Sequence, residues 1–327
     1  MRALVVEHLA PDYAGCGLKT VAAPEPGPGE VRVKVRAAAV NFPDLLMTRG
    51  EYQHKPPLPF IPGLEFAGEV EALGEGVDHW RSGDAVLGSA RMGAFAEFTV
   101  AIAHALRPKP ERLSFAEAAA TGAAYLTAYV ALVRRAAIAP GEWALIHGAA
   151  GGVGLAAVDL AKVLGAKVIA ASASDEKLAA VAAAYAPDAV LNVTGGFREQ
   201  VKALTGGRGA DVIFDPVGGE VFDESARCIA FDGRLLIVGF TSGRIPQIGV
   251  NMPLIKGYSI MGVRAGEYGR QFPEKGRENL DAVWTLAAQG QIRPHVHAEL
   301  PLEFWREAFD LLTRRRVIGK AVLRLDL

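Results

Sequence analysis

The chain has little cysteine and no excess of charge of either sign. Its 327 residues include only two cysteines, Cys16 and Cys228, so it has neither a disulfide framework nor a zinc site built from cysteines. Its 35 Lys and Arg against 36 Asp and Glu leave a net charge of −1, whereas a dedicated nucleic-acid binder carries a basic surplus. This length predicts about two domains.

Long apolar runs are also lacking. The most apolar uncharged stretch, residues 118–133, is rich in Ala, Thr and Gly and falls short of the about 20 strongly apolar residues of a membrane span. We expect it to be a buried helix. Residues 1–7 contain an early acid and no signal-peptide pattern. We therefore expect a soluble, cytoplasmic protein with no membrane or nucleic-acid partner.

The first hundred residues have the pattern of a β domain. In residues 31–36, valines alternate with charged residues at the two-residue period of a half-buried strand. Further strands are predicted at residues 66–71, 85–87 and 95–100. Ser114 and Glu117 then have the spacing of a capping box, which predicts an Ala-rich helix to about residue 137, broken near Thr121 and Gly122.

From residue 143 to about 263, short apolar strands alternate with amphipathic helices, which predicts an α/β fold with a doubly wound parallel sheet. We expect its strands at residues 143–147, 167–171, 189–191, 211–214, 234–238 and 258–263. The C-terminal part predicts helices at residues 274–289 and 302–314 and a final strand at 320–325.

A glycine-rich turn follows the first of these strands. Gly151 and Gly154 fit the second and third positions of a G-x-G-x-x-G pattern, and Ala149 occupies the first. Such a turn brings backbone N–H groups and a helix N-terminus against a pyrophosphate, where side chains would block the approach. The surrounding strand-helix-strand pattern therefore predicts a dinucleotide site.

The end of the next strand distinguishes the two nicotinamide dinucleotides. An acid there binds the ribose 2′-hydroxyl of NADH, whereas the 2′-phosphate of NADPH needs a neutral residue and a cation. Ser172 stands at this place and Lys177 follows one helical turn later, which predicts NADPH. This interpretation requires Asp175 and Glu176 to point elsewhere, and Lys177 has the alternative of being a solvated helix cation.

Five motifs carry a family resemblance over the whole chain. They are Asn-Phe-Pro-Asp at 41–44, Gly-Leu-Glu-Phe-Ala-Gly at 63–68, residues 147–154, Phe-Asp-Pro-Val-Gly-Gly at 214–219, and Val-Gly-Phe at 238–240. Together they resemble the medium-chain dehydrogenase/reductase superfamily, and within it the zinc-independent NADPH:quinone oxidoreductases. The resemblance implies a GroES-like β-rich catalytic domain (residues 1–122 and 265–327), a Rossmann domain (123–264), and an active site in the cleft between them.

The sequence departs from the zinc-using relatives at the metal site. Those relatives have a Cys where this chain has Asn41 and a His where it has Leu64, and the Cys-rich structural zinc loop is missing. Glu65 is present, but one carboxylate cannot hold zinc, so we expect no metal. Alcohol oxidation would then lack a Lewis acid for the alkoxide, whereas a quinone or an activated C=C bond is already electrophilic.

The resemblance also implies the site residues. The catalytic candidates are Asn41, Tyr52 and Thr127. The cofactor residues are Asn41 and Thr127 at the nicotinamide end, Ala150, Gly151, Gly152 and Val153 at the pyrophosphate, Ser172 and Lys177 at the 2′-phosphate, Phe240 and Val263 around the nicotinamide ring, with Val217 and Lys320 as further contacts.

Structural alternatives stand beside four of these roles. Asn41 either donates its amide to the acceptor or serves a turn, and Tyr52 either offers a phenol to the developing oxyanion or packs as an aromatic. Thr127 has the alternative of bonding a carbonyl of its own helix, and Lys320 that of a surface strand cation. A tyrosine that many relatives place near the 2′-phosphate is Val193 here.

These observations predict an NADPH-dependent reductase of quinones or α,β-unsaturated carbonyls. An enoyl-thioester reductase acting on acryloyl-CoA-like substrates and a non-catalytic NADPH-binding protein are the alternatives. The resemblance further suggests a homodimer joined through the edge strand at residues 258–263, because an exposed edge is otherwise prone to unwanted pairing.

Overall fold

The computed structural model describes residues 1–90 and 92–325. The chain divides into two units. Unit 1 comprises Met1–Gly122 and Pro294–Leu327, and unit 2 comprises Ala123–Arg293. The first boundary lies where we expected it, but the second lies at residue 293 rather than 264. The helix at 273–289 groups with unit 2 because Arg134 Nε donates to Asn279 Oδ1 at 2.6 Å and the Arg134 guanidinium pairs with Glu278.

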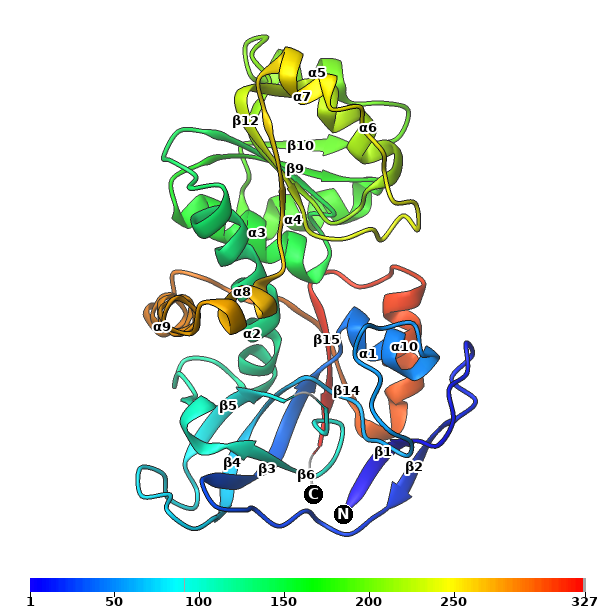
Figure 1. The fold of residues 1–327 in the computed structure, drawn as a ribbon, viewed down its shortest axis with the longest axis vertical. Helices are drawn as coiled ribbons and strands as arrows, with labels where there is room; N and C mark the ends of the chain where they lie inside the picture. The colour runs from blue at the N-terminus through cyan, green and yellow to red at the C-terminus, as the bar shows by residue number, and fades with distance from the viewer. Residues whose placement is uncertain (91, 326–327) are drawn as a thin grey trace. The chain divides into compact units, whose positions relative to one another are not determined.

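Unit 1 is built around antiparallel β structure, and its first and last strands belong to the same unit (Figure 1). Its elements are β1 (Arg2–Val6), β2 (Cys16–Thr20), β3 (Glu30–Ala39), α1 (Phe42–Arg49), β4 (Glu65–Leu73), β5 (Ala85–Ser89), β6 (Phe98–Ile102), η1 (Ala103–Ala105), β7 (Arg107–Pro108), β14 (Val296–Pro301), η3 (Leu302–Phe304), α10 (Trp305–Thr313) and β15 (Lys320–Arg324).

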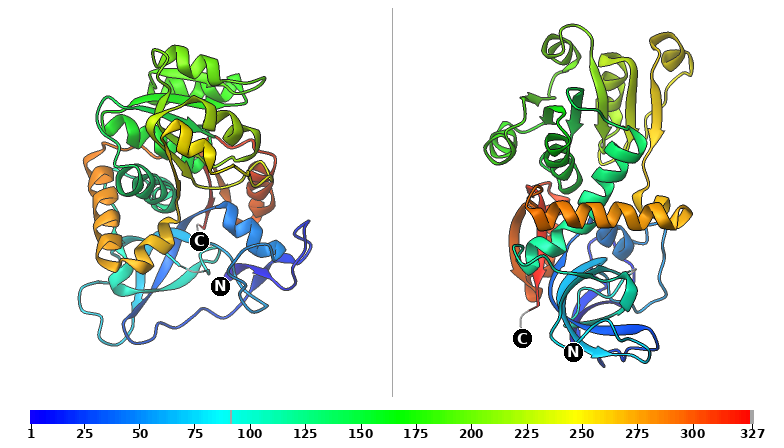
Figure 2. Two further views of the ribbon diagram at one scale, coloured as in Figure 1. Left: turned by 45° about the horizontal axis from the view of Figure 1, so that its top comes forward. Right: turned by 90° about the vertical axis from the view of Figure 1, so that its left-hand side faces the viewer.

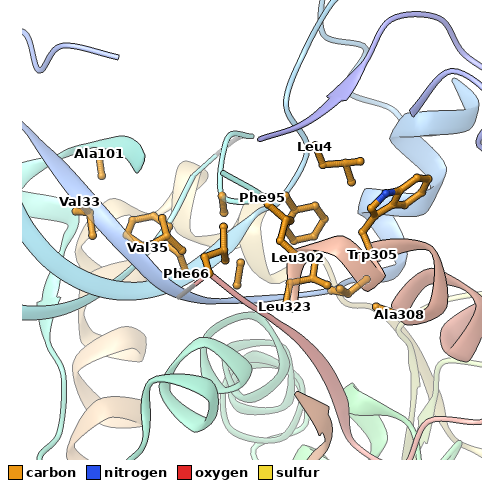
Figure 3. Packing of buried hydrophobic residues seen from close by; sticks show 14 of the residues in the cluster. Leu4, Val33, Val35, Phe66, Phe95, Ala101, Leu302, Trp305, Ala308 and Leu323 are labelled. Atoms are coloured by element: carbon orange, nitrogen blue, oxygen red, sulfur yellow. The ribbon is translucent and has the colours of Figure 1, made fainter. Parts of the chain in front are cut away.

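The alternating valines of β3 produce the central strand of this unit. Val31, Val33 and Val35 are fully buried, as the two-residue period predicted. The main sheet has the order β14-β15-β3-β4-β5-β7, and β6 also pairs with β3. Strand β14 was not predicted, and it pairs in parallel with β15 at the sheet edge. Figure 3 shows Phe66, Phe95, Leu302 and Leu323 among the side chains of the cluster that fills this unit.

The Ala-rich helix begins as its capping box predicted. Ser114 Oγ accepts from the Glu117 N–H at 3.1 Å, and Glu117 Oε2 accepts from the Ser114 N–H at 2.8 Å. Helix α2 (Phe115–Tyr129) and the π-helical η2 (Val130–Arg135) follow; the expected break near residues 121–122 was wrong, since α2 runs through them. The stretch Phe115–Arg135 is long and apolar enough to cross a membrane by length and composition, but 61% of its apolar window is buried inside the protein.

Unit 2 contains one parallel sheet with helices that connect its strands (Figure 2). Its elements after η2 are β8 (Trp143–His147), α3 (Gly152–Val163), β9 (Lys167–Ser172), α4 (Asp175–Tyr185), β10 (Ala189–Asn192), α5 (Arg198–Leu204), β11 (Ala210–Asp215), α6 (Gly219–Cys228), β12 (Ile229–Ile237), α7 (Asn251–Lys256), β13 (Ser259–Gly262), α8 (Ala265–Gln271) and α9 (Pro273–Gln289).

The strand order of this sheet is β10-β9-β8-β11-β12-β13, with every neighbouring pair parallel. Numbered along the chain, these strands have the order 3-2-1-4-5-6 of a dinucleotide-binding fold. The point where this order reverses lies between β8 and β11. Helices α3 and α4 contact each other and strands β8, β9 and β10, while α5 and α6 contact each other. The predicted α/β class, with its doubly wound sheet, is confirmed.

Candidate functional site

The turn after β8 brings backbone close to backbone. Gly148 has a φ of +58°, a conformation that glycine adopts without strain. A Cβ added to Gly154 would lie 2.1 Å from the Gly148 carbonyl oxygen, so only a glycine lets α3 start this close to the turn. Helix α3 begins at Gly152 after Gly151, which leaves the first N–H groups of the helix without helical acceptors. This is the geometry of a phosphate cradle.

Two buried polar residues support the sheet edge beside this turn. His147, at the end of β8, places Nε2 2.9 Å from Ser225 Oγ, and burial lowers its pKa to about 3, so the ring is neutral at pH 7. Asp215, at the end of β11, accepts from the N–H groups of Val217 and Gly218 at 2.8 and 2.9 Å, which fixes the turn after that strand. Burial raises the pKa of the Asp215 carboxyl.

Eight of the predicted cofactor residues lie at the carboxyl ends of the unit 2 strands. Ala150, Gly151, Gly152 and Val153 follow β8, Ser172 ends β9, Val217 follows β11, Phe240 follows β12 and Val263 follows β13. Open parallel sheets bind ligands at this edge, beside the point where the strand order reverses. Phe240 is 40% exposed, whereas Val263 is 7% exposed and donates its N–H to the Ile237 carbonyl.

Ser172 and Lys177 flank the start of α4. Ser174 caps the helix by accepting the Lys177 N–H at 3.3 Å, and Ser172 Oγ accepts the Ser174 N–H at 3.4 Å. Asp175 accepts a hydrogen bond from Asn192 Nδ2 at 2.7 Å. One of the two carboxylates that an NADPH site must turn away is therefore held by a neighbouring amide.

Unit 1 contains a closed cluster of three polar side chains from distant parts of the chain. Lys320 Nζ donates to Asn41 Oδ1 at 2.5 Å, and Asn41 Nδ2 donates to Glu65 Oε2 at 2.8 Å. Lys320 Nζ also lies 3.4 Å from the same Glu65 oxygen. The Lys320 and Glu65 side chains are only 8% and 4% exposed, so the surface-cation alternative for Lys320 is excluded.

The amide of Asn41 is nearly saturated by these contacts. Its second Nδ2 hydrogen is directed to the Ala39 carbonyl oxygen, at a longer distance of 3.3 Å. A ligand that accepts from Asn41 therefore replaces this longer bond. A Cβ added to Gly122 would lie 2.7 Å from Glu65 Oε1, so this glycine of α2 leaves room for the Glu65 carboxylate.

Asp44 is the buried neighbour of this cluster. Its Oδ2 accepts the Asn41 N–H at 2.8 Å and its Oδ1 accepts the Gly63 N–H at 3.1 Å, which ties the start of α1 to the segment before β4. Burial, with a smaller contribution from the Glu65 carboxylate, raises the pKa of the Asp44 carboxyl to about 7 against the opposing effects of the Asn41 N–H and the Lys320 ammonium.

The other two catalytic candidates lie in different surroundings. Tyr52 is partly buried, and its ring packs against the core of unit 1. Thr127 lies on the part of α2 that belongs to unit 2, and its Oγ1 donates to the Ala123 carbonyl at 2.7 Å, within its own helix.

The donor set does not fit zinc. At two positions where the resemblance implies zinc ligands in other members of the superfamily, this chain has the amide of Asn41 and the alkyl chain of Leu64. Across residues 1–90 and 92–325, no group of three or more His, Cys, Asp or Glu side chains is placed to hold a metal ion. Zinc sites in proteins use such ligands, three of them at a catalytic centre.

The sequence analysis missed two features of the site. The role of Gly148 was missed, although a glycine directly after a buried strand is itself a signal for a left-handed turn. The contact between Asn41 and Lys320 joins residues 279 positions apart, and the sequence holds no local pattern for it.

These features define a class: a dinucleotide-binding oxidoreductase with a β-rich unit and a Rossmann-type unit. Comparison with known proteins agrees. The family model described as alcohol dehydrogenase GroES-like domain matches residues 27–111, and the one described as zinc-binding dehydrogenase matches residues 152–283.

Similar proteins narrow the class to a family. Mouse quinone oxidoreductase-like protein 2 is 41% identical over 305 residues, covering 93% of this chain and 87% of its own length. Human quinone oxidoreductase is 31% identical over 307 residues, covering 93% and 92%. The crystal structure of Escherichia coli quinone oxidoreductase complexed with NADPH superposes with a TM-score of 0.88 at 30% identity, covering 99% of this chain and 100% of that one. The chain therefore belongs to the medium-chain dehydrogenase/reductase superfamily, among its quinone oxidoreductase-like members.

Proposed function

We propose that this oxidoreductase transfers a hydride from NADPH to a quinone or an α,β-unsaturated carbonyl without a metal ion. The observation that carries the proposal is the cluster of Asn41, Glu65 and Lys320. It presents an amide and an ammonium, both hydrogen-bond donors, at the place where metal-using relatives hold zinc ligands. Donors of this kind stabilise an oxyanion but do not activate an alcohol for oxidation.

The unit 2 residues would hold the cofactor by its phosphates. The backbone N–H groups of residues 150–153 would bind the pyrophosphate at the start of α3. Ser172 and Lys177 would bind the 2′-phosphate, since Ser172 adds no negative charge and Lys177 adds a positive one. The structure of the E. coli relative in complex with NADPH supports the choice of cofactor.

The nicotinamide end would be framed by Thr127, Val217, Phe240 and Val263. When bound, the nicotinamide supplies the hydride, and the protein contributes position and electrostatics. Asn41 and Tyr52 of unit 1 would donate hydrogen bonds to the acceptor oxygen. A proton from water completes the reduction, so that one hydride and one proton convert an enone to a ketone or a quinone to a hydroquinone.

The experiment that tests this function follows NADPH oxidation at 340 nm with four acceptors in parallel: 1,4-benzoquinone, a larger quinone, cyclohexenone and a crotonyl thioester. We expect turnover with the quinones or the enone, with NADPH preferred over NADH. Turnover of the thioester alone would identify an enoyl-thioester reductase instead. Tight NADPH binding with no turnover of any acceptor would indicate a non-catalytic binding protein.

Metal independence has its own measurement. We expect elemental analysis to find no stoichiometric zinc and dialysis against a chelator to leave the rate unchanged. Loss of activity on chelation, with recovery on adding Zn²⁺, would refute this part of the proposal.

We also propose that the chain forms a homodimer through β13. This strand pairs only with β12 among the described residues, so its other edge is unpaired. Large apolar side chains are exposed on β12, on and just before α7, and on β13. In that order they are Phe231, Val250, Leu254, Ile255 and Ile260. Light scattering should give twice the mass of one chain, and Leu254→Asp should weaken the association; a monomeric mass for the unmodified protein would exclude the dimer.

A further inference from the structure

The position of Lys320 is unusual for a lysine. A buried lysine normally has its charge paired or loses its proton, because removing an ammonium from water is costly. Lys320 Nζ lies 2.5 Å from Asn41 Oδ1 and 3.4 Å from Glu65 Oε2, and its side chain is 8% exposed. Glu65 supplies the opposite charge of an ion pair, and Asn41 Oδ1 accepts from the ammonium. The ammonium is therefore a fixed cation with a defined direction.

The contacts leave part of this ammonium available to a ligand. A lysine ammonium has three donor hydrogens. Asn41 and Glu65 accept two of them, and the described residues 1–90 and 92–325 offer no third acceptor for the side chain. The Lys320 side chain is 8% exposed, and its third hydrogen is the one that we assign to a bound molecule below.

The same cluster explains how the cation is held. Asn41 Nδ2 donates to Glu65 Oε2 at 2.8 Å, so the three side chains close a ring in which the amide oxygen can only face the ammonium. The carboxylate contacts the ammonium from within this ring. An anion bound to the third hydrogen would contact the ammonium and not the carboxylate, so the net interaction would be attractive at short range.

We propose that Lys320 is a catalytic residue of the acceptor site. Its third hydrogen donates to the carbonyl oxygen of the quinone or enone, where negative charge develops as hydride adds to the conjugated carbon. The two electrons of the hydride form the new C–H bond, the π electrons move to the oxygen, and Lys320 keeps its proton. Water then protonates the enolate of an enone; in a quinone adduct the new C–H proton is lost to water as the ring becomes aromatic and both oxygens are protonated. This role rests on the proposed function, and it supplies a fixed positive charge from the protein itself.

The variants remove the ammonium in a background that lacks the Glu65 carboxylate, so that its loss does not leave this buried carboxylate unpaired. The double variant Lys320→Met/Glu65→Gln removes both charges and keeps an acceptor for Asn41 Nδ2. Glu65→Gln alone is its reference, and Lys320→Arg tests rescue by a second cation. Lys34→Met removes a lysine from strand β3 of the same sheet and is the matched charge control.

The first measurement is kinetic. Relative to Glu65→Gln, the double variant should lose about 100-fold or more in kcat with cyclohexenone, the usual effect of removing one oxyanion donor. The dissociation constant for NADPH, measured by quenching of protein fluorescence, should stay within about twofold, because hydride acceptor and cofactor are bound by different groups. Lys34→Met should match the unmodified protein, and Lys320→Arg should recover part of the rate. Equal kcat in the double variant and its reference would overturn the proposal, and a raised NADPH dissociation constant with unchanged kcat would make Lys320 a cofactor ligand instead.

The second measurement does not need turnover. 4-Nitrophenolate carries the charge of the developing oxyanion, and nitrobenzene has a similar ring with no net charge. The Glu65→Gln protein should bind 4-nitrophenolate about tenfold or more tightly than the double variant does, while both bind nitrobenzene alike. Equal phenolate affinity would refute the role of Lys320. An unmodified protein that reduces no acceptor would refute the proposed function, so the two failures are distinguishable.

Discussion

Asp44 should make the stability of the protein fall as the pH rises. The carboxyl is fully buried and accepts hydrogen bonds from the N–H groups of Asn41 and Gly63. Burial raises its pKa from 3.8 to about 7 in the folded protein, with Glu65 adding to the rise and Lys320 opposing it. Between pH 3.8 and about 7, Asp44 therefore keeps a proton in the folded state that it has already released in the unfolded state.

The sign and size follow from linkage. A carboxyl whose folded-state pKa is raised contributes stability that is fully present below pH 3.8 and is lost as the pH rises through about 7. Each unit of difference corresponds to about 1.4 kcal/mol, so Asp44 should lower the free energy of unfolding by about 3 kcal/mol between pH 5 and pH 8.

Urea denaturation at pH 5 and pH 8, followed by tryptophan fluorescence, measures this change. Asp44→Asn cannot titrate, so the difference between the unmodified protein and this variant isolates the contribution of Asp44. The variant loses one of two hydrogen bonds and should be less stable at pH 5, but its own change between the two pH values should be smaller by about 3 kcal/mol. Asp78→Asn removes a carboxylate whose side chain is 97% exposed and should reproduce the unmodified pH dependence. The same pH dependence in Asp44→Asn and the unmodified protein would refute the reasoning.

Three further changes test the cofactor turn and the core of unit 2. Lys177→Met should raise the KM for NADPH by about tenfold or more and leave that for NADH unchanged, because only NADPH carries the 2′-phosphate; equal shifts for both cofactors would contradict the assignment. Gly154→Ala places a Cβ 2.1 Å from a backbone oxygen of the turn. It should weaken NADPH binding by about tenfold and cost about 1–3 kcal/mol of stability, whereas Gly17→Ala, in open space, should do neither in calorimetry and titration. Tyr125→Phe removes a 2.6 Å hydrogen bond to a buried carboxylate and should cost about 1–3 kcal/mol in urea denaturation. The Tyr258 hydroxyl is buried and has no hydrogen-bond partner among residues 1–90 and 92–325, so Tyr258→Phe should be neutral or stabilising, and an equal loss in both variants would exclude the hydrogen bond as the cause.

The architecture of unit 2 was largely predictable because it depends on local patterns. The strand at Trp143–His147 has the predicted bounds, and those at Lys167–Ser172 and Ala189–Asn192 differ by one residue. Buried parallel strands are short apolar runs, and the turns between them are marked by glycine and by capping residues such as Ser174. The alternation of strands and helices predicted parallel pairing, since parallel neighbours need helical crossovers, but the order of the strands came from the structure.

Other parts of the fold depend on contacts that no local pattern records. Strand Val296–Pro301 was missed although its apolar residues Val296, Ala298 and Leu300 alternate with polar ones, but its parallel pairing with β15 at the sheet edge has no such local signal. The assignment of the helix Pro273–Gln289 to unit 2 depends on Arg134, which lies far earlier in the chain. A sequence pattern predicts that such a helix exists, but it does not show which unit the helix packs against.

The candidate site divides in the same way. The glycine turn is encoded locally, because close approach of backbone to backbone at Gly154 admits one residue type only. The role of Asn41 is not encoded locally, because the residues around it do not show whether its amide is exposed or held between Glu65 and Lys320. The structure changes the argument here: both donor hydrogens of Asn41 already have protein acceptors, so the stronger free donor beside it is the ammonium of Lys320. If that ordering is right, Asn41→Ala should slow reduction less than removal of the Lys320 charge does. Combining the two changes should add little to the loss of the lysine alone, because the amide acts mainly by holding the cation in place.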